Sequence, residues 1–249
     1  MSRTFRASPL VFVALFAAFA VGVLARPAIA SAWYGLRSAD APEARPNAEF
    51  ADADMLELAR VQQQWGTTGD IVMLGDSITA MGQWSEMFPA ADILNRGLGG
   101  DTVADIAARA PIVLETKAKS IFLMVGVNDL FADATDEEIY RDLDRALEIL
   151  GRDGATLYLQ SPLVCGKGEV CTPERRARMR GWLSEFERIA RAHEATYIDL
   201  NARMAGPDGL RETLSWDGIH PNGEGLKVWR DILRPYIESA TKGAGGIAA

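Results

Sequence analysis

The chain has 249 residues, of which 48% are hydrophobic and 24% are charged. This length and apolar content fit one α/β domain with a substantial core and leave little room for a second domain. The formal net charge is -8 and no long run of Lys or Arg occurs. We therefore do not expect nucleic acid as a partner.

The N-terminal residues have the pattern of an export signal. Arg3 and Arg6 precede an uncharged apolar run, Pro9–Leu24, which is followed by the small-residue triplet that ends at Ala30. This order predicts a signal peptide over residues 1–30, and hence a periplasmic or secreted protein. The alternative is an uncleaved segment that anchors the protein, although the run is somewhat shorter than the roughly 20 residues of a membrane span. Such an anchor would be the only membrane contact that we expect.

Composition divides the rest of the chain into three parts. Residues 31–46 are rich in Ala, Pro, Arg and Ser, and we interpret them as a linker. The folded domain is predicted over residues 47–241, starting with a helix at Asp52–Trp65 where apolar residues have helical spacing. Residues 242–249 are predicted to be a disordered tail.

Within the domain, short apolar runs alternate with amphipathic stretches. Strands are predicted at Ile71–Leu74, Ile93–Leu94, Ser120–Val127, Ala155–Gln160 and Tyr197–Leu200. Helices are predicted at Thr79–Met87, Val103–Lys117, Asp136–Leu150, Pro173–His193 and Gly223–Ser239. Thr135 and Glu138 have capping-box spacing, and Pro173 follows Thr172 at a helix start. This α/β alternation predicts a mostly parallel sheet with helices on both faces and ligands beyond the carboxyl ends of the strands.

Ser77 is the first candidate for chemistry. It stands two residues after Gly75, at the end of the first strand and just before a predicted helix. Its hydroxyl should therefore lie at the carboxyl edge of the sheet, beside backbone N–H groups that favour developing negative charge. The alternative is that Asp76 and Ser77 are ordinary helix caps.

A nucleophilic serine needs a positioned base, and the chain has two histidines. His220 lies on a turn-rich loop three residues after Asp217, which could orient the imidazole ring. The alternative is a turn stabilised by Asp217 with His220 simply exposed. His193 is the competing base, but it ends a long charged helix, where a histidine suits the helix dipole without any chemistry.

Two further segments could donate hydrogen bonds to an oxyanion at the same edge. The glycine-rich stretch Asn95–Thr102 contains Gly100, and the stretch Gly126–Asp129 contains Asn128. The first could instead be a phosphate-binding loop or a plain turn, although it lacks the dinucleotide-binding spacing. Asn128 could instead be a turn residue or a helix cap.

Cys165 and Cys171 are the only cysteines, and they flank a short glycine-containing loop. In an exported protein they are expected to form a disulfide, and the alternative is a pair of free thiols. The loop could hold one wall of a substrate pocket or serve only as a stabilising staple. We predict no metal site, because two scattered histidines cannot complete one with these thiols.

The four segments together resemble the SGNH hydrolases, also called GDSL esterases/lipases. Gly-Asp-Ser, a Gly before Asp, Gly-x-Asn-Asp and Asp-x-x-His occur in the family's order over residues 70–240. The sequence looks closest to the bacterial branch similar to platelet-activating-factor acetylhydrolase subunits and to small lysophospholipase/thioesterase members. The larger α/β-hydrolase group fits less well, because its nucleophile follows several strands.

The resemblance implies a three-layer, flavodoxin-like α/β fold with a five-stranded parallel sheet of order 2-1-3-4-5 and helices on both faces. It also implies a triad of Ser77, His220 and Asp217, with an oxyanion hole made by Ser77, Gly100 and Asn128. Neither a metal nor a cofactor is needed.

We predict a serine esterase for short-chain acyl groups such as acetyl, carried on a small molecule or a glycan. An O-acetyltransferase or a lysophospholipase/thioesterase could use the same site. A catalytically silent glycan-binding module would require a broken set of site residues, and none is visibly broken.

Overall fold

A computed structural model describes residues 53–65, 68–132, 134–168 and 170–244. They belong to the compact unit that runs from Pro46 to Ala249. The predicted signal peptide, the linker and the last five residues lie outside the described residues. Among the helices that are described, none has the length and apolar character needed to cross a membrane.

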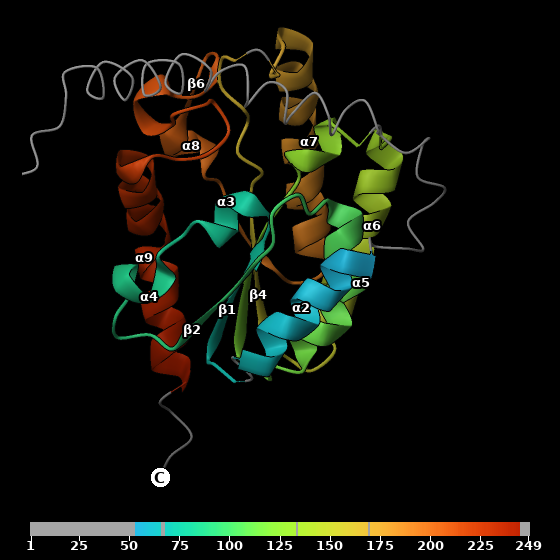
Figure 1. Ribbon diagram of the computed structural model, residues 1–249, viewed down its shortest axis with the longest axis vertical. Coiled ribbons are helices and arrows are strands. Elements are labelled where there is room, and N and C mark those ends of the chain that lie inside the picture. The colour runs from blue at the N-terminus through green and yellow to red at the C-terminus, as the bar shows by residue number, and fades with distance from the viewer. Residues whose placement is uncertain (1–52, 66–67, 133, 169, 245–249) are drawn as a thin grey trace, which may run out of the picture. The chain divides into compact units, whose positions relative to one another are not determined.

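The core of the unit is a five-stranded parallel sheet (Figure 1). Its strands are β1 (Ile71–Gly75), β2 (Ile93–Gly97), β3 (Ser120–Met124), β4 (Thr156–Gln160) and β5 (Thr196–Ile198). The spatial order β2-β1-β3-β4-β5 confirms the predicted 2-1-3-4-5 arrangement. All residues of β1 and β3 are buried, as expected for central parallel strands that are covered on both faces.

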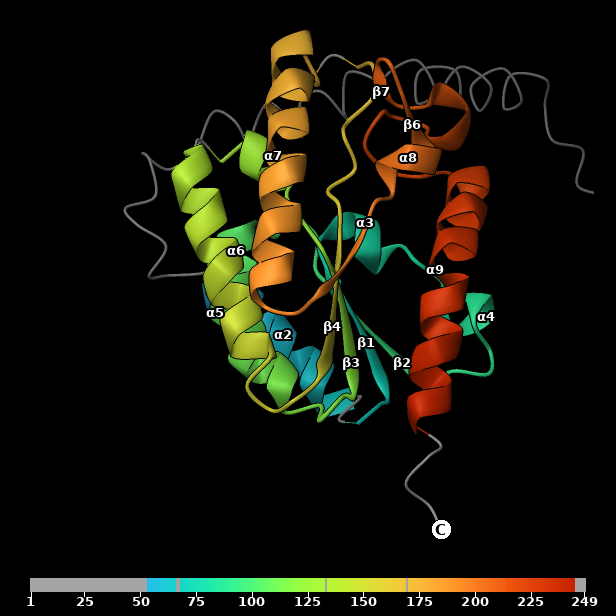
Figure 2. The same cartoon turned by 180° about the vertical axis from the view of Figure 1, so that it is seen from behind.

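Helices cover both faces of this sheet, as Figures 1 and 2 show from opposite sides. One face carries α2 (Ala53–Trp65), α5 (Val103–Leu114), α6 (Asp136–Leu150) and α7 (Pro173–Ala192). The other face carries α4 (Trp84–Met87) and α9 (Gly223–Ala244). Trp84 and Trp229 meet edge to face between these last two helices, with ring centroids 4.9 Å apart. The predicted three-layer α/β class is therefore confirmed.

Side-chain caps fix where the helices start. The predicted capping box at Thr135 is present: its hydroxyl accepts from the Glu138 N–H, and the Glu138 carboxylate accepts from Thr135. Thr172 caps α7, with Pro173 in the first turn as expected. A second box, Thr102 with Asp105, starts α5 and was not predicted. It places the first turn of α5 directly after the glycine-rich stretch.

The predicted helix over Thr79–Met87 is wrong. The structure has two short helices instead, α3 (Ser77–Ala80) and α4, separated by residues 81–83. The Trp84 indole N–H donates to the Thr79 carbonyl at 3.0 Å, and the ring lies so close to Gly82 that a Cβ there would be 2.2 Å from it. Packing of this buried indole therefore turns the chain after one helical turn.

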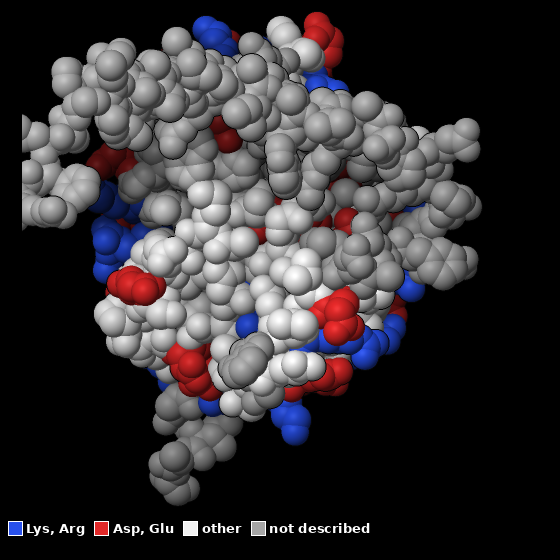
Figure 3. All heavy atoms as spheres, in the orientation of Figure 1, with Lys and Arg blue, Asp and Glu red and all other residues white. Residues whose placement is uncertain are grey.

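Other differences lie at element ends. The strand predicted over Ser120–Val127 stops at Met124, and α9 continues through Ala244, so the first three residues of the predicted tail are helical. Smaller elements went unpredicted: α8 (Asn201–Met204), the hairpin β6 (Ala205–Gly206) with β7 (Gly209–Leu210), and the 3₁₀ turns Asn128–Leu130 and Glu212–Leu214. On the face seen in Figure 3, the described acidic and basic side chains are interspersed in small groups.

Candidate active site

Ser77 opens the one-turn helix α3 directly after β1. The helix cap is Asp76, whose carboxylate Oδ1 accepts from the Ile78 N–H at 2.9 Å. The alternative role that the sequence allowed for Ser77, that of a cap, is therefore filled by its neighbour. The Ser77 hydroxyl instead lies 2.9 Å from His220 Nε2.

Gly75 makes this sharp exit from β1 possible. A Cβ at this position would lie 2.1 Å from the Met124 carbonyl oxygen and 2.3 Å from the Thr79 hydroxyl, so no larger residue fits. The Gly75 carbonyl accepts from the Leu98 N–H at 2.9 Å. The end of β1 is thus held against the start of the glycine-rich stretch after β2.

His220 connects Ser77 to a carboxylate. Its Nδ1 lies 2.6 Å from Asp217 Oδ2, and its Nε2 faces the Ser77 hydroxyl from 143 positions away in the sequence. An ionised carboxylate can only accept, so Nδ1 carries the proton and Nε2 is the acceptor for Ser77. This is the hydrogen-bond order that proton transfer from a serine requires.

The loop that carries this pair is fixed by its own backbone. Asp217 Oδ1 accepts from the N–H groups of Ile219 and His220 at 2.9 and 2.8 Å, which leaves Oδ2 for the imidazole. The Ser215 hydroxyl donates to the His220 carbonyl at 2.8 Å, and Asn222 Oδ1 accepts from the Glu224 N–H at the start of α9. Both ends of the loop are therefore held.

Asp217 is ionised in this setting. Partial burial by itself raises the pKa of its carboxyl, but the hydrogen bonds from the His220 side chain and from the two backbone N–H groups outweigh burial and bring the pKa below its ordinary value. A carboxylate that stays charged can hold the imidazole tautomer and stabilise an imidazolium.

Gly100 and Asn128 follow β2 and β3, the two strands that neighbour β1 in the sheet. A Cβ at Gly99 would lie 3.9 Å from the Ser77 Cβ, so the glycine-rich stretch passes beside the nucleophile. Gly100 has φ +93°, a conformation that favours glycine, and a Cβ there would meet no atom within 4 Å. Asn128 Nδ2 donates to the Asp101 carbonyl at 2.8 Å. That bond fixes the amide and uses one of its two hydrogens.

Three aspartates are buried beneath this edge. Burial raises the pKa of Asp76 to about 7 and of Asp129 to about 8, against opposing hydrogen bonds from backbone N–H groups. Burial also raises the pKa of Asp101 to about 6, although the Arg109 guanidinium opposes the shift. The three buried aspartates therefore have higher pKa values than Asp217 and take up a proton more readily.

The remaining candidates lie apart from Ser77 or beside the histidine loop. His193 Nε2 lies 2.9 Å from Asp144 Oδ1, so this histidine pairs helix α6 with the end of α7 and not with the serine. Cys165 and Cys171 are joined in a disulfide with Cα atoms 6.1 Å apart. Gly166, inside that loop, donates its N–H to the Gly218 carbonyl at 2.6 Å. The disulfide loop is therefore a neighbour of the loop that carries Asp217 and His220.

Residues 73–228 match the family model of the GDSL-like lipase/acylhydrolases. The chain belongs to this family. The predicted family is confirmed, and the chain is a GDSL-type hydrolase that acts on esters. The matched residues run from β1 into α9, so they include each of the four segments described above.

Solved structures share the fold of this GDSL-like hydrolase. A candidate platelet activating factor protein from Streptococcus pneumonia is 19% identical, with a TM-score of 0.65 over 74% of this chain and 91% of that one. A catalytic mutant of an acetylxylan esterase from Geobacillus stearothermophilus is 17% identical, with a TM-score of 0.57 over 69% of this chain and 95% of the other.

Curated relatives match over a shorter part of their own length. The N-acylneuraminate cytidylyltransferase of Streptococcus agalactiae serotype V (strain ATCC BAA-611 / 2603 V/R) is 24% identical over 144 residues. These are 58% of the GDSL-like chain and 34% of the relative, so the chain spans about a third of that protein.

Sequence reasoning missed one buried part of the site. Arg109, on α5, donates to the Asp101 carboxylate and to the backbone at the ends of β1 and β2. Asp101 lay within the segment that the sequence singled out, but Arg109 lay within a predicted helix with no motif of its own. The only available signal was a charged residue on the apolar stripe of that helix.

Proposed function

We propose that the protein is a serine esterase in which Ser77 is the nucleophile, His220 the base and Asp217 the group that orients His220. The observation that carries the proposal is the continuous hydrogen-bond chain from the Ser77 hydroxyl through both ring nitrogens of His220 to the Asp217 carboxylate, with steps of 2.9 and 2.6 Å. Geometry of this kind activates a hydroxyl that is otherwise a poor nucleophile near neutral pH.

In the first step, Ser77 Oγ attacks the ester carbonyl carbon while its proton moves to His220 Nε2. The resulting oxyanion accepts hydrogen bonds from the N–H groups of Ser77 and Gly100 and from the Asn128 amide. The tetrahedral intermediate then collapses, the carbon–oxygen bond to the alcohol breaks, and the proton on Nε2 passes to the leaving alkoxide.

In the second step, a water molecule replaces the alcohol. His220 accepts a proton from the water as its oxygen attacks the acyl carbon, and it returns that proton to Ser77 Oγ when the acyl–serine bond breaks. The products are a carboxylic acid and the free serine. An alcohol that enters in place of water would give the O-acetyltransferase reaction.

We further propose a short acyl group, such as acetyl, on a sugar hydroxyl. The Trp216 ring is 57% exposed and stacks near His220, with centroids 6.0 Å apart and planes 14° from parallel. Trp216 also lines a cavity of about 360 Å³, together with the polar residues Lys167, Glu212 and Ser215. An aromatic face next to polar groups suits a sugar ring, which has an apolar face and a hydroxyl rim. The acetylxylan esterases with this fold are consistent with such a substrate.

The reaction class is tested with chromogenic esters of acyl chains from two to twelve carbons, with Ser77→Ala as the control. We expect hydrolysis to be fastest for acetyl esters and to disappear in the variant. Equal hydrolysis by the variant would refute the assignment of Ser77. A preference for long acyl chains would favour the lysophospholipase/thioesterase alternative.

The leaving group is tested with Trp216→Ala, by comparing an acetylated sugar with an aryl acetate. We expect KM to rise for the sugar ester while kcat changes little, because the ring would contribute binding that is equal in the ground state and the transition state. An equal effect on both substrates contradicts the sugar site. Added sugar alcohol that captures the acyl group would favour the acetyltransferase alternative.

We also propose that the protein is exported through its N-terminal segment, as the Arg residues before an apolar run predict. Fractionation of expressing cells, with mass measurement of the mature chain, tests both export and cleavage after Ala30.

A further inference from the structure

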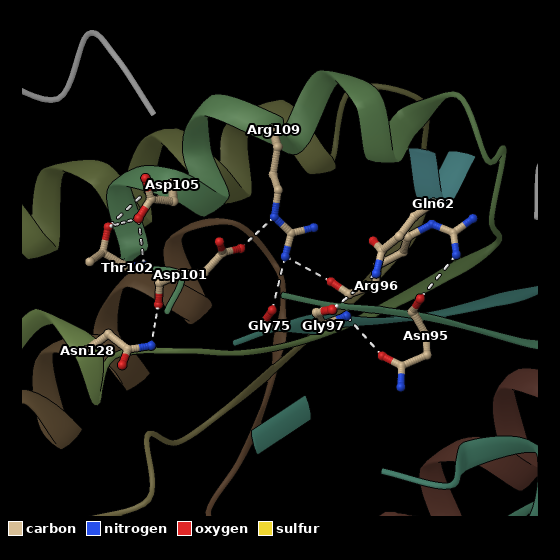
Figure 4. A network of polar contacts seen from close by, with 10 residues as sticks. All are labelled: Gln62, Gly75, Asn95, Arg96, Gly97, Asp101, Thr102, Asp105, Arg109 and Asn128. Atoms are coloured by element: carbon tan, nitrogen blue, oxygen red, sulfur yellow. Dashed lines mark hydrogen bonds and ion pairs between the residues drawn. The ribbon is translucent and has the colours of Figure 1, made fainter. Parts of the chain in front are cut away.

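Arg109 is a buried cation beneath the candidate oxyanion hole. It lies on the inner face of α5, and its side chain is 1% exposed. Its Nε donates to Asp101 Oδ2 at 2.6 Å, and the Asp101 side chain is itself fully buried. Figure 4 shows the guanidinium reaching from the helix toward the ends of the first two strands.

The other bonds of this guanidinium go to backbone. Its Nη2 donates to the Gly75 carbonyl at 3.0 Å and to the Arg96 carbonyl at 2.8 Å. Gly75 stands two residues before Ser77, and Arg96 lies near the end of β2, at the start of the glycine-rich stretch. One planar group therefore ties together the backbone from which Ser77 and Gly100 emerge (Figure 4).

Asp101 carries this connection to the third donor. Its carboxylate pairs with Arg109, and its backbone carbonyl accepts from the Asn128 amide at 2.8 Å. A second contact joins the segment after β2 to the segment after β3: the Val103 backbone nitrogen lies 3.2 Å from each carboxylate oxygen of Asp129. All three groups expected to bind the oxyanion are thus linked to Arg109 indirectly, Ser77 through Gly75 and Asp76, and Gly100 and Asn128 through Asp101.

Stability alone gives little reason to place a charge here. Burial of a guanidinium costs several kcal/mol, and apolar residues of similar volume are often as stable as a buried ion pair. A planar fork with five N–H donors, by contrast, can fix several acceptors in one geometry. The bonds to Gly75 and Arg96 use that property, since a single nitrogen reaches carbonyls on two strands.

We infer that Arg109 is a positioning residue for the oxyanion hole. It holds the ends of β1 and β2 and the Asp101 carboxylate, so that the N–H groups of Ser77 and Gly100 and the Asn128 amide face one point. This inference rests on the proposed esterase function. It adds a residue that touches neither substrate nor reacting atoms and acts through the groups that do.

The test is Arg109→Lys, which keeps the charge but loses the planar fork. We expect kcat for an aryl acetate to fall about 10²-fold, the cost of roughly 1 Å of misplacement, while KM stays close to that of the wild type. A boronic acid reports on the site separately, because its boron accepts the serine oxygen and becomes a tetrahedral anion. Its inhibition constant should rise in parallel with the loss of kcat.

Arg178→Lys is the matched control. Arg178 also pairs through Nε with a carboxylate, Asp136 at 2.7 Å, and donates through Nη2 to a backbone carbonyl, that of Ala134. These contacts join α7 to the start of α6, and none of them involves Ser77, Gly100 or Asn128. We expect this variant to lose thermal stability and to keep both kcat and boronic acid affinity.

Asp101→Asn is the second variant, because it keeps the side-chain volume and both backbone contacts of Arg109. We expect a smaller loss of kcat, again with matching loss of boronic acid affinity. If either variant folds and binds the boronic acid as tightly as the wild type does, the inference is overturned while the esterase function stands. Failure of both to fold would make Arg109 a structural residue and would also overturn it. A wild-type chain without esterase activity would refute the proposed function itself.

Discussion

The oxyanion side of the candidate site is buried and held by charge, whereas the triad loop is exposed and held by backbone. Asp101 and Arg109 have 0% and 1% of their side-chain surface exposed, but Asp217 and His220 have 37% and 20%. The first pair lies in the core at the ends of parallel strands. The second lies on a surface loop beside a disulfide.

This difference sets the protonation of each aspartate. Burial raises the pKa of Asp129 to about 8, whereas the hydrogen bonds on partly solvated Asp217 bring its pKa below the ordinary value. An acid buried like Asp129 could not remain charged beside His220 near neutral pH. Groups that only hold a position can therefore lie in the core uncharged, but the group that stabilises an imidazolium must stay charged, and the hydrogen bonds from His220 and the backbone N–H groups favour this at Asp217.

The largest expected effect comes from the triad loop. His220→Ala should lower kcat on the order of 10⁶-fold, as loss of the base in a serine triad does. The matched control is His193→Ala, which removes the only other histidine and should leave turnover unchanged, because His193 pairs with Asp144. Steady-state kinetics on an acetyl ester measure both variants. A His220→Ala chain that turned over as fast as the wild type would exclude His220 as the base.

The next effect belongs to the oxyanion side. Asn128→Ala should lower kcat about 10²- to 10³-fold, the usual cost of one oxyanion donor. It should leave the rate constant's dependence on pH unchanged, since the loop of Asp217 and His220 is intact. Unchanged turnover would remove Asn128 from the hole, and an altered pH profile would mean that the two halves are coupled.

Reduction of the disulfide should affect the triad loop and spare the oxyanion side. Gly166, in the closed loop, donates to Gly218, which lies between Asp217 and His220. Release of a closed loop this short costs about 2 kcal/mol of stability in the chain-entropy view. We expect a several-fold loss of kcat/KM and a change in preference between sugar and aryl acetates before any unfolding. Kinetics with and without a thiol reductant, with Cys165→Ser as a second route, measure this; identical preference in both states contradicts it.

The smallest expected effect is on stability as pH changes. Folded Asp129 keeps its proton up to about pH 8, but the unfolded chain releases it near the ordinary value of 3.8. This group therefore stabilises the fold fully below pH 4, and the contribution is lost as pH rises through about 8. Asp129→Asn cannot ionise, so its Tm relative to that of the wild type should rise by about 2 to 4 °C as the pH is raised from 5 to 9. This shift corresponds to about 1 kcal/mol of unfolding free energy.

The comparison variant is Asp217→Asn. In the wild type, folding lowers the pKa of Asp217. The Asp217 carboxylate therefore stabilises the fold at pH values above its ordinary pKa, and this contribution is lost as the pH falls. No gain in Tm at pH 9 is expected for this variant. Parallel behaviour of the two variants in thermal melts across this pH range would contradict the contrast between buried and exposed acids.

Much of this arrangement could be predicted from the sequence, because the relevant signals are local. Apolar runs marked the five strands, Thr135 with Glu138 marked a helix start, and Gly-Asp-Ser together with Asp-x-x-His marked the two segments that the hydrogen bonds of His220 join. Parallel strands bring their carboxyl ends to one edge, so local signals were enough to predict that Ser77, Gly100 and Asn128 follow the adjacent strands β1, β2 and β3.

The parts that sequence could not predict depend on contacts between distant segments. The break after α3 comes from the Trp84 indole, which packs against α9 through Trp229 and bonds to the Thr79 carbonyl. Arg109 bonds to backbone carbonyls, which have no sequence signature at all. The pKa of Asp129 is likewise a matter of burial and not of its neighbours in the chain.

The separation of 143 positions between Ser77 and His220 has a consequence for when the two residues can first meet. A chain that is still being synthesised can complete β1 and its nucleophile long before the loop with the histidine exists. Contacts so distant in sequence close late, because the chain between them must first be ordered. A ribosome-bound intermediate that stops before Asp217 therefore lacks both partners of Ser77, and the hydrogen-bond chain can form only after the loop that precedes α9 has been made.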